Sequence, residues 1–89
     1  MRIVEITWED SVAWPGWQHQ SDAEKWIDHP GHMQRSAGYL FSEDKRSVTL
    51  VQSEQVDGPR IGELLQIPKA AILRARYADT ARAVRWRRK

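Results

Sequence analysis

A two-residue alternation of apolar side chains, sustained from residue 36 to residue 77, constrains the fold of this chain more than any other feature. Such alternation predicts β-strands with one buried face. It falls into four runs, at residues 37–41, 48–51, 61–67 and 71–77. The polar turn at 43–46 makes the first two runs a hairpin. Because Pro68 removes a ladder donor and forces a bend before the last run, the layout predicts a small, strongly bent barrel.

The N-terminal part adds one strand and one helix to this layout. Residues 3–8 alternate apolar and polar side chains, which predicts the first of five strands. Its apolar face carries Val4, Ile6 and Trp8. Ser21 and Glu24 fit a capping box, so a short α-helix of about two turns should begin at Ser21 and end before the turn at 29–32. We expect this helix, between strands 1 and 2, to plug one end of a mainly β barrel.

Chain length and composition limit the organisation to one small domain. The 89 residues, 40% of them apolar, suffice for a barrel at residues 1–78 followed by a basic tail at 79–89. A lone barrel of this size buries little surface, so assembly through an edge strand or an aromatic face would add stability, and we expect a homo-oligomer. The absence of cysteine excludes disulfides and thiolate metal ligands. No secretory signal and no membrane-spanning apolar run is visible, so we expect a cytoplasmic protein.

The net charge of +2 is unevenly distributed. Residues 79–89 carry +4, whereas the other 78 residues carry −2. The tail contains Arg82, Arg85, Trp86, Arg87, Arg88 and Lys89. A tryptophan among basic residues is typical of a nucleic-acid-binding arm; the alternative is a solvated terminus whose tryptophan lies against a neighbouring subunit. The acidic balance of the body argues against a broad nucleic-acid-binding face there.

Two loops have more than one interpretation. Trp14 and Trp17 flank a Pro-Gly turn. They either cap the open end of the barrel, where buried aromatics stabilise a small core, or one of them stacks on a planar ligand such as a base. The loop at residues 53–60 is longer than a tight hairpin requires, which fits either a binding loop or an ordinary solvated one.

The last predicted strand carries two arginines at alternate positions. Arg74 and Arg76 are expected on one face with Ile72, and residues 73, 75 and 77 on the other. Edge-strand charges discourage aggregation; alternatively these arginines hold a phosphate, for which guanidinium groups are well matched. The candidate ligand-binding residues are Trp14, Trp17, Arg60, Lys69, Arg74 and Arg76.

The histidines and the hydroxyl groups do not form a motif for metal binding or catalysis. His29 and His32 flank a Pro-Gly turn, and Asp28 and His19 could complete a shell of ligands, but this spacing does not place them on one helical face. Ser11 beside Asp10 has no elbow or oxyanion motif, so the pair reads as a turn. We therefore expect no metal site, no cofactor and no enzymatic activity.

A series of short motifs runs along about residues 3–76: Trp8-Glu9-Asp10-Ser11, Gly16-Trp17, Ser36 to Leu40, Val48-Thr49-Leu50, Ser53, Gly62 and Ile67 to Ile72. In these motifs the chain resembles a group of short bacteriophage proteins of unassigned function. The strand order, with a tight turn before the last strand, is also similar to SH3-like and Sm-like small barrels, many of which form rings. The chain has no asparagine, and Ile67-Pro68-Lys69 stands where the Sm arginine-glycine signature would fall, so the Sm type of uridine readout is not expected.

These observations favour a binding protein. The leading hypothesis is a phage accessory protein that sequesters a phosphate-bearing small molecule, such as a nucleotide signal of host anti-phage defence, in pockets between subunits in the host cell cytoplasm. The phage context comes from the resemblance alone. One alternative is an RNA- or DNA-binding barrel that uses the basic tail; another is a structural or host-protein-inhibiting phage component.

Overall fold

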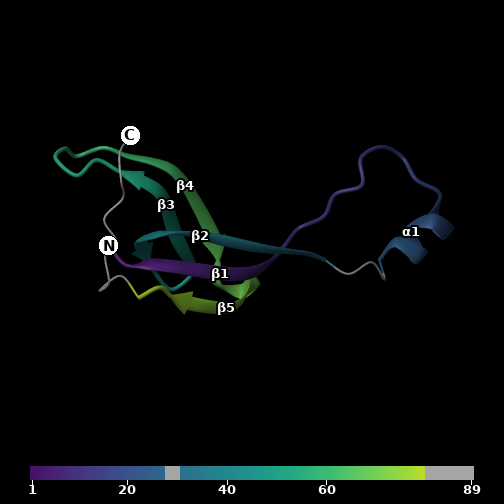
Figure 1. The fold of residues 1–89 in the computed structure, drawn as a ribbon. Helices are drawn as coiled ribbons and strands as arrows, with labels where there is room; N and C mark the ends of the chain where they lie inside the picture. Colours follow the sequence, from purple (N-terminus) through teal and green to yellow (C-terminus); the bar gives the residue numbers. More distant parts are fainter. Residues whose placement is uncertain (28–30, 80–89) are drawn as a thin grey trace, which may run out of the picture.

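The computed structural model describes residues 1–27 and 31–79, which form one five-stranded sheet with a projecting helix (Figure 1). The strands are β1 (Ile3–Asp10), β2 (His32–Glu43), β3 (Ser47–Glu54), β4 (Ile61–Pro68) and β5 (Ile72–Tyr77). The helix α1 (Gln20–Trp26) lies between β1 and β2 in the chain, and a 3-10 turn, η1 (Lys69–Ala71), joins β4 to β5. All neighbouring strands are antiparallel, in the order β4-β3-β2-β1-β5. The predicted mainly β fold is confirmed.

The described sheet is open, and in this respect the expected closed barrel is not found. β4 and β5 are its two edges, with no ladder between them among the described residues. Four successive antiparallel pairs make β4 and β5 run in the same direction across the sheet. Closure would therefore require a parallel pair, and the three residues of η1 are too few for the crossover that such a pair needs.

The core lies on one face of this bent sheet. The buried side chains Val4 and Ile6 of β1 pack with three residues of the β3 and β4 strands, Val48, Leu50 and Ile67. Trp8, Leu40 and Ile72 pack against this cluster. The indole Nε1 of Trp8 donates a hydrogen bond to Ser36 Oγ at 3.0 Å, which satisfies its polar atom. The sequence-predicted apolar face of the first strand is thus confirmed.

Gly38 lies in β2 close to the residues at which this strand pairs with both β1 and β3. β2 pairs with β1 along Tyr39 to His32 and with β3 along Tyr39 to Glu43. A Cβ at Gly38 would lie only 2.9 Å from the backbone oxygen of Val51, so a side chain there would press on the neighbouring strand. The β3–β4 hairpin is turned away from the direction of β1 and β5 (Figure 1).

The turn between β2 and β3 is held by one carboxylate. Asp44 Oδ1 accepts hydrogen bonds from the backbone N–H groups of Arg46 and Ser47, both at 2.8 Å. These bonds favour the ionised form and hold the pKa of Asp44 below its ordinary value of 3.8. The predicted hairpin turn at 43–46 is confirmed.

The helix differs from the prediction in its N-terminal cap and in its position. α1 begins at Gln20 with His19 as its N-cap, and no side chain caps it, so the predicted Ser21–Glu24 capping box is wrong. None of its residues is buried, and it lies away from the sheet instead of plugging one end (Figure 1). The predicted stop at 29–32 falls partly on residues 28–30, which lie outside the described residues. Across residues 1–27 and 31–79, no helical segment has the length and apolar character needed to traverse a lipid bilayer.

Candidate anion-binding site

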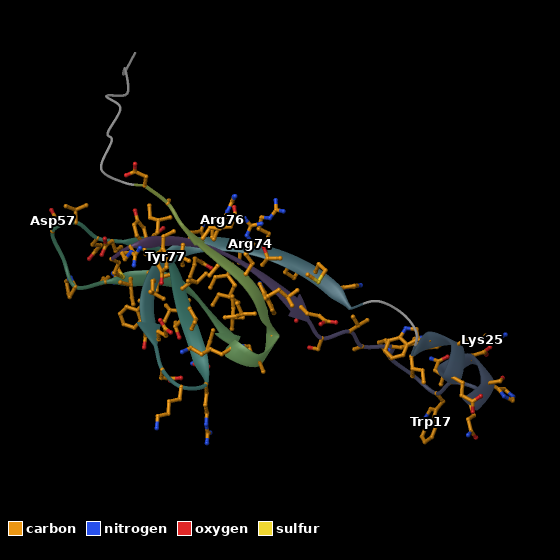
Figure 2. The ribbon with its side chains drawn as sticks, turned by 90° about the horizontal axis from the view of Figure 1, so that it is seen from below. Trp17, Lys25, Asp57, Arg74, Arg76 and Tyr77 are labelled. Carbon is orange, nitrogen blue, oxygen red and sulfur yellow. The ribbon has the colours of Figure 1, made fainter. Side chains whose placement is uncertain are left out.

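A bulge in β5 decides which of its side chains share a face. Thr7 pairs with Arg74, but Trp8 pairs with Ile72, so the register shifts by one residue at Leu73. Ile72 therefore lies on the core side, where it packs against the buried cluster, and its predicted place beside the arginines is wrong. Arg74 and Arg76 do share one face, as predicted, and point away from the sheet on the same side (Figure 2).

Arg76 and a third arginine, Arg35 of β2, share a single carboxylate, and Arg74 lies on the same face of the sheet. Arg76 lies opposite Glu5, and its Nη2 is 3.3 Å from Glu5 Oε1. Arg35 Nε is 3.8 Å from the same oxygen. Arg74 and Arg35 both lie opposite Thr7, from the two strands that flank β1, and directly opposed residues share a face. We call Arg35, Arg74, Arg76 and Glu5 the arginine face; its formal charge is +2.

The charges of the arginine face are open to solvent. The side chains of Arg35 and Arg76 are 73% and 60% exposed, and that of Glu5 is 33% exposed. Exposed ion pairs of this kind contribute at most about 1 kcal/mol each to folding. Each guanidinium has five N–H donors, and Glu5 takes few of them. Most of the donors therefore face water and are available to an added anion.

A hollow lies beside this cluster, at the end of β5. Its volume is about 370 Å³, within the range of small-ligand sites. It is lined by Ile3, Val4, Glu5, Ala37, Arg76, Tyr77 and Ala78. The guanidinium carbon of Arg2 lies 3.5 Å from the centroid of the Tyr77 ring, a cation–π contact that places a positive charge over this aromatic side chain of the lining. Arginine donors and an aromatic ring thus border one concave surface.

The other two predicted phosphate ligands lie elsewhere. Lys69 is in η1, where its Nζ is 2.7 Å from Glu43 Oε2, and it borders a different hollow of about 300 Å³ on the core side. Arg60 comes just before β4, at the opposite edge of the sheet from β5. The structure therefore brings together Arg74 and Arg76 but adds neither Arg60 nor Lys69 to them.

The two loop tryptophans are not part of this face within one chain. Trp14 packs against Trp26 of α1, with ring centroids 5.8 Å apart, and Trp17 is fully exposed at 102%. Figure 2 shows Trp17 at the helical end of the molecule, remote from Arg74 and Arg76. Neither tryptophan caps an end of the sheet, so that interpretation is wrong.

Several other candidate residues lie outside the described residues. These are Asp28, His29, Arg82, Arg85, Trp86, Arg87, Arg88 and Lys89. Within residues 1–27 and 31–79, no group of three or more histidine, aspartate or glutamate side chains is arranged to hold a metal ion. The arginine face itself offers donors to an anion and has no set of ligands for a cation.

Arg35 and Arg2 were absent from the sequence-based candidate set. Arg35 lies in the polar start of β2, and only the register Thr7–Arg35 places it beside Glu5. Its position could have been inferred from the β1–β2 pairing, had the length of β2 been known.

Searches against protein-family models, curated proteins and solved structures gave no match to this chain.

Proposed function

We propose that this protein is a binding protein whose arginine face holds a phosphate-bearing small ligand. The observation that supports the proposal is the presence of Arg35, Arg74 and Arg76 on one face of the sheet, two of them paired with Glu5, beside a hollow of about 370 Å³. A guanidinium group presents paired N–H donors that match two oxygens of a phosphate. Because arginine stays protonated at any physiological pH, these groups suit binding rather than proton transfer.

A nucleotide is the ligand class that we favour. The phosphate would lie against Arg74 and Arg76, and a planar base could stack on the guanidinium plane of Arg2, which is itself held over Tyr77. On the resemblance to short bacteriophage proteins, the ligand would be a nucleotide signal of host defence, which the protein sequesters. The basic tail supports a second candidate, a polynucleotide.

Calorimetric titration of inorganic phosphate and of cyclic and linear nucleotides against Arg74→Ala and Arg76→Ala tests the proposal. Removing one charged hydrogen bond should cost about 1.5–3 kcal/mol, or roughly a ten- to hundredfold loss of affinity. Arg60→Ala is the matched control, since it removes the same charge at the opposite edge of the sheet. A control that weakens binding as much as Arg76→Ala would show non-specific attraction instead of a site.

A labelled oligonucleotide separates the two candidates. If the protein binds polynucleotides through its tail, deletion of residues 79–89 should abolish binding and flatten its salt dependence. If Arg74→Ala and Arg76→Ala then behave like the parent protein toward every ligand, the small-ligand proposal fails and the polynucleotide takes its place.

A further inference from the structure

The segment that carries α1 leaves the sheet as an arm. β1 and β2 stay paired as far as Asp10 and His32, whereas the ladder between β1 and β5 ends at Trp8 and Ile72. The last pairs of β1 and β2 therefore form a two-stranded ribbon beyond the five-stranded sheet. We call residues 9–27 the arm; Figures 1 and 2 show it extending from the sheet with α1 at its far end.

The arm exposes apolar side chains that the other residues described by the structure leave open to solvent. Trp17 is 102% exposed, Ile27 72% and Trp14 41%, and the seven-residue α1 has no buried residue. A helix this short is unstable in water by itself, because most helical stability in proteins comes from packing against another surface. The contact between the Trp14 and Trp26 rings lies within the arm and does not attach it to the sheet. Packing against a further surface would stabilise the arm.

The charge of the arm identifies that surface. Glu9, Asp10, Asp22 and Glu24 are opposed by Lys25 alone, so the arm carries −3. The arginine face carries the opposite sign and is flanked by exposed apolar side chains, Met33 of β2 and Leu73 at the bulge of β5, 55% and 60% exposed. The arginine face therefore offers positive charge to the acidic side chains of the arm and apolar surface to its exposed apolar side chains. Within one molecule the helical end of the arm lies apart from the arginine face, with Trp17 and Lys25 remote from Arg74 and Arg76 (Figure 2), while Glu9 at the base of the arm pairs with Met33.

We propose that the arm docks on the arginine face of a second copy of this chain. Asp22 and Glu24 would pair with the partner's Arg74 and the partner's Arg76, while Trp17 packs against apolar side chains beside them. Two copies can exchange arms reciprocally, because each chain has one arm and one arginine face, and such an arrangement closes as a two-fold dimer. This association needs no ligand and stands independently of the proposed phosphate binding.

Charge reversal on each surface, alone and together, tests the pairing by analytical ultracentrifugation of the full chain. Asp22→Arg with Glu24→Arg, or Arg74→Glu with Arg76→Glu, should each shift the dimer toward the 10.4 kDa monomer. Like charges would then face each other, and the dissociation constant should rise on the order of tenfold or more. The variant that combines both pairs of substitutions restores opposite signs and should dimerise again.

Glu54→Arg with Asp57→Arg is the control, since it makes the same charge change in the β3–β4 hairpin. All the substituted side chains are exposed, and circular dichroism checks that each variant keeps its sheet. A monomer throughout the micromolar range would overturn the proposal. So would a dimer that survives both reversals, a control that dissociates it equally, or a combined variant that stays monomeric.

Discussion

Replacing Gly38 by alanine should destabilise the protein, because the added methyl group meets backbone rather than a movable side chain. An ideal Cβ there lies 2.9 Å from the oxygen of Val51 and 3.4 Å from the Cβ of Leu50. Val51 is fully buried and paired on both sides, with Tyr39 and Leu64, so its carbonyl cannot easily retreat. Overpacking of this kind costs about 1–3 kcal/mol. The smaller conformational entropy of alanine in the unfolded chain offsets about 0.4–1 kcal/mol of that cost.

Gly62→Ala is the matched control for this substitution. Gly62 also lies in a strand, but an added Cβ would meet nothing within 4 Å, so alanine should leave stability unchanged or raise it by about 0.4–1 kcal/mol. Urea unfolding followed by circular dichroism should place Gly38→Ala about 1–3 kcal/mol below the control. In thermal melts of a domain this small, each kcal/mol corresponds to about 4–8 °C. If Gly38→Ala is as stable as Gly62→Ala, the close approach of β2 and β3 is not what requires glycine.

Three further predictions concern the core, the hairpin turn and the arginine face. Ile67→Ala should lower the free energy of unfolding, measured by urea titration, by about 2–5 kcal/mol, since this side chain is fully buried. Leu64→Ala on the same strand should cost much less, because Leu64 is 57% exposed. Equal losses in the two variants would contradict the assigned core. Asp44 has a lowered folded pKa, so its contribution to stability is present above about pH 3.8 and is lost as the pH falls toward the folded pKa. Melts of Asp44→Asn should lack this part of the acid dependence, and identical pH profiles would refute the role of the carboxylate. If the arm and phosphate use the same arginines, inorganic phosphate should dissociate the dimer in sedimentation runs more than chloride does at equal ionic strength. By linkage, the variant with Asp22→Arg and Glu24→Arg should bind phosphate more tightly than the parent protein does. A dimer that is unaffected by phosphate, with unchanged phosphate affinity in that variant, would contradict a shared site.

Alternation of apolar residues was sufficient to predict the strands and most of the core. Val4 and Ile6 lie two residues apart on one strand, and Val48 and Leu50 on another, so both pairs fall on one face by local geometry alone. Ile67 follows the same rule in β4. The turn at Asp44 was predicted for a similar reason, since its hydrogen bonds reach only two and three residues along the chain.

Features that depend on register were predicted less well. Ile72 was placed beside the arginines because strict alternation puts residues 72, 74 and 76 on one face; the bulge at Leu73 changes this, and nothing in the composition of β5 marks it. Arg35 was missed because β2 extends back to His32, well before the apolar run from which the strand was predicted. A pairing register is a long-range property, and no single strand encodes it.

The net charge of residues 1–78 conceals an uneven distribution of acidic and basic side chains in space. Residues 1–78 carry −2, which the sequence analysis took as an argument against a broad nucleic-acid-binding face on the body. The arm alone carries −3, so the remainder of the body carries +1. Because the ribbon of β1 and β2 holds Asp22 and Glu24 away from the sheet, these two carboxylates do not neutralise the arginine face of their own chain, which keeps a formal charge of +2 after pairing with Glu5. The same separation leaves the arginine face open either to a phosphate or to the carboxylates of a second copy, so competition between the two would report directly on both proposals.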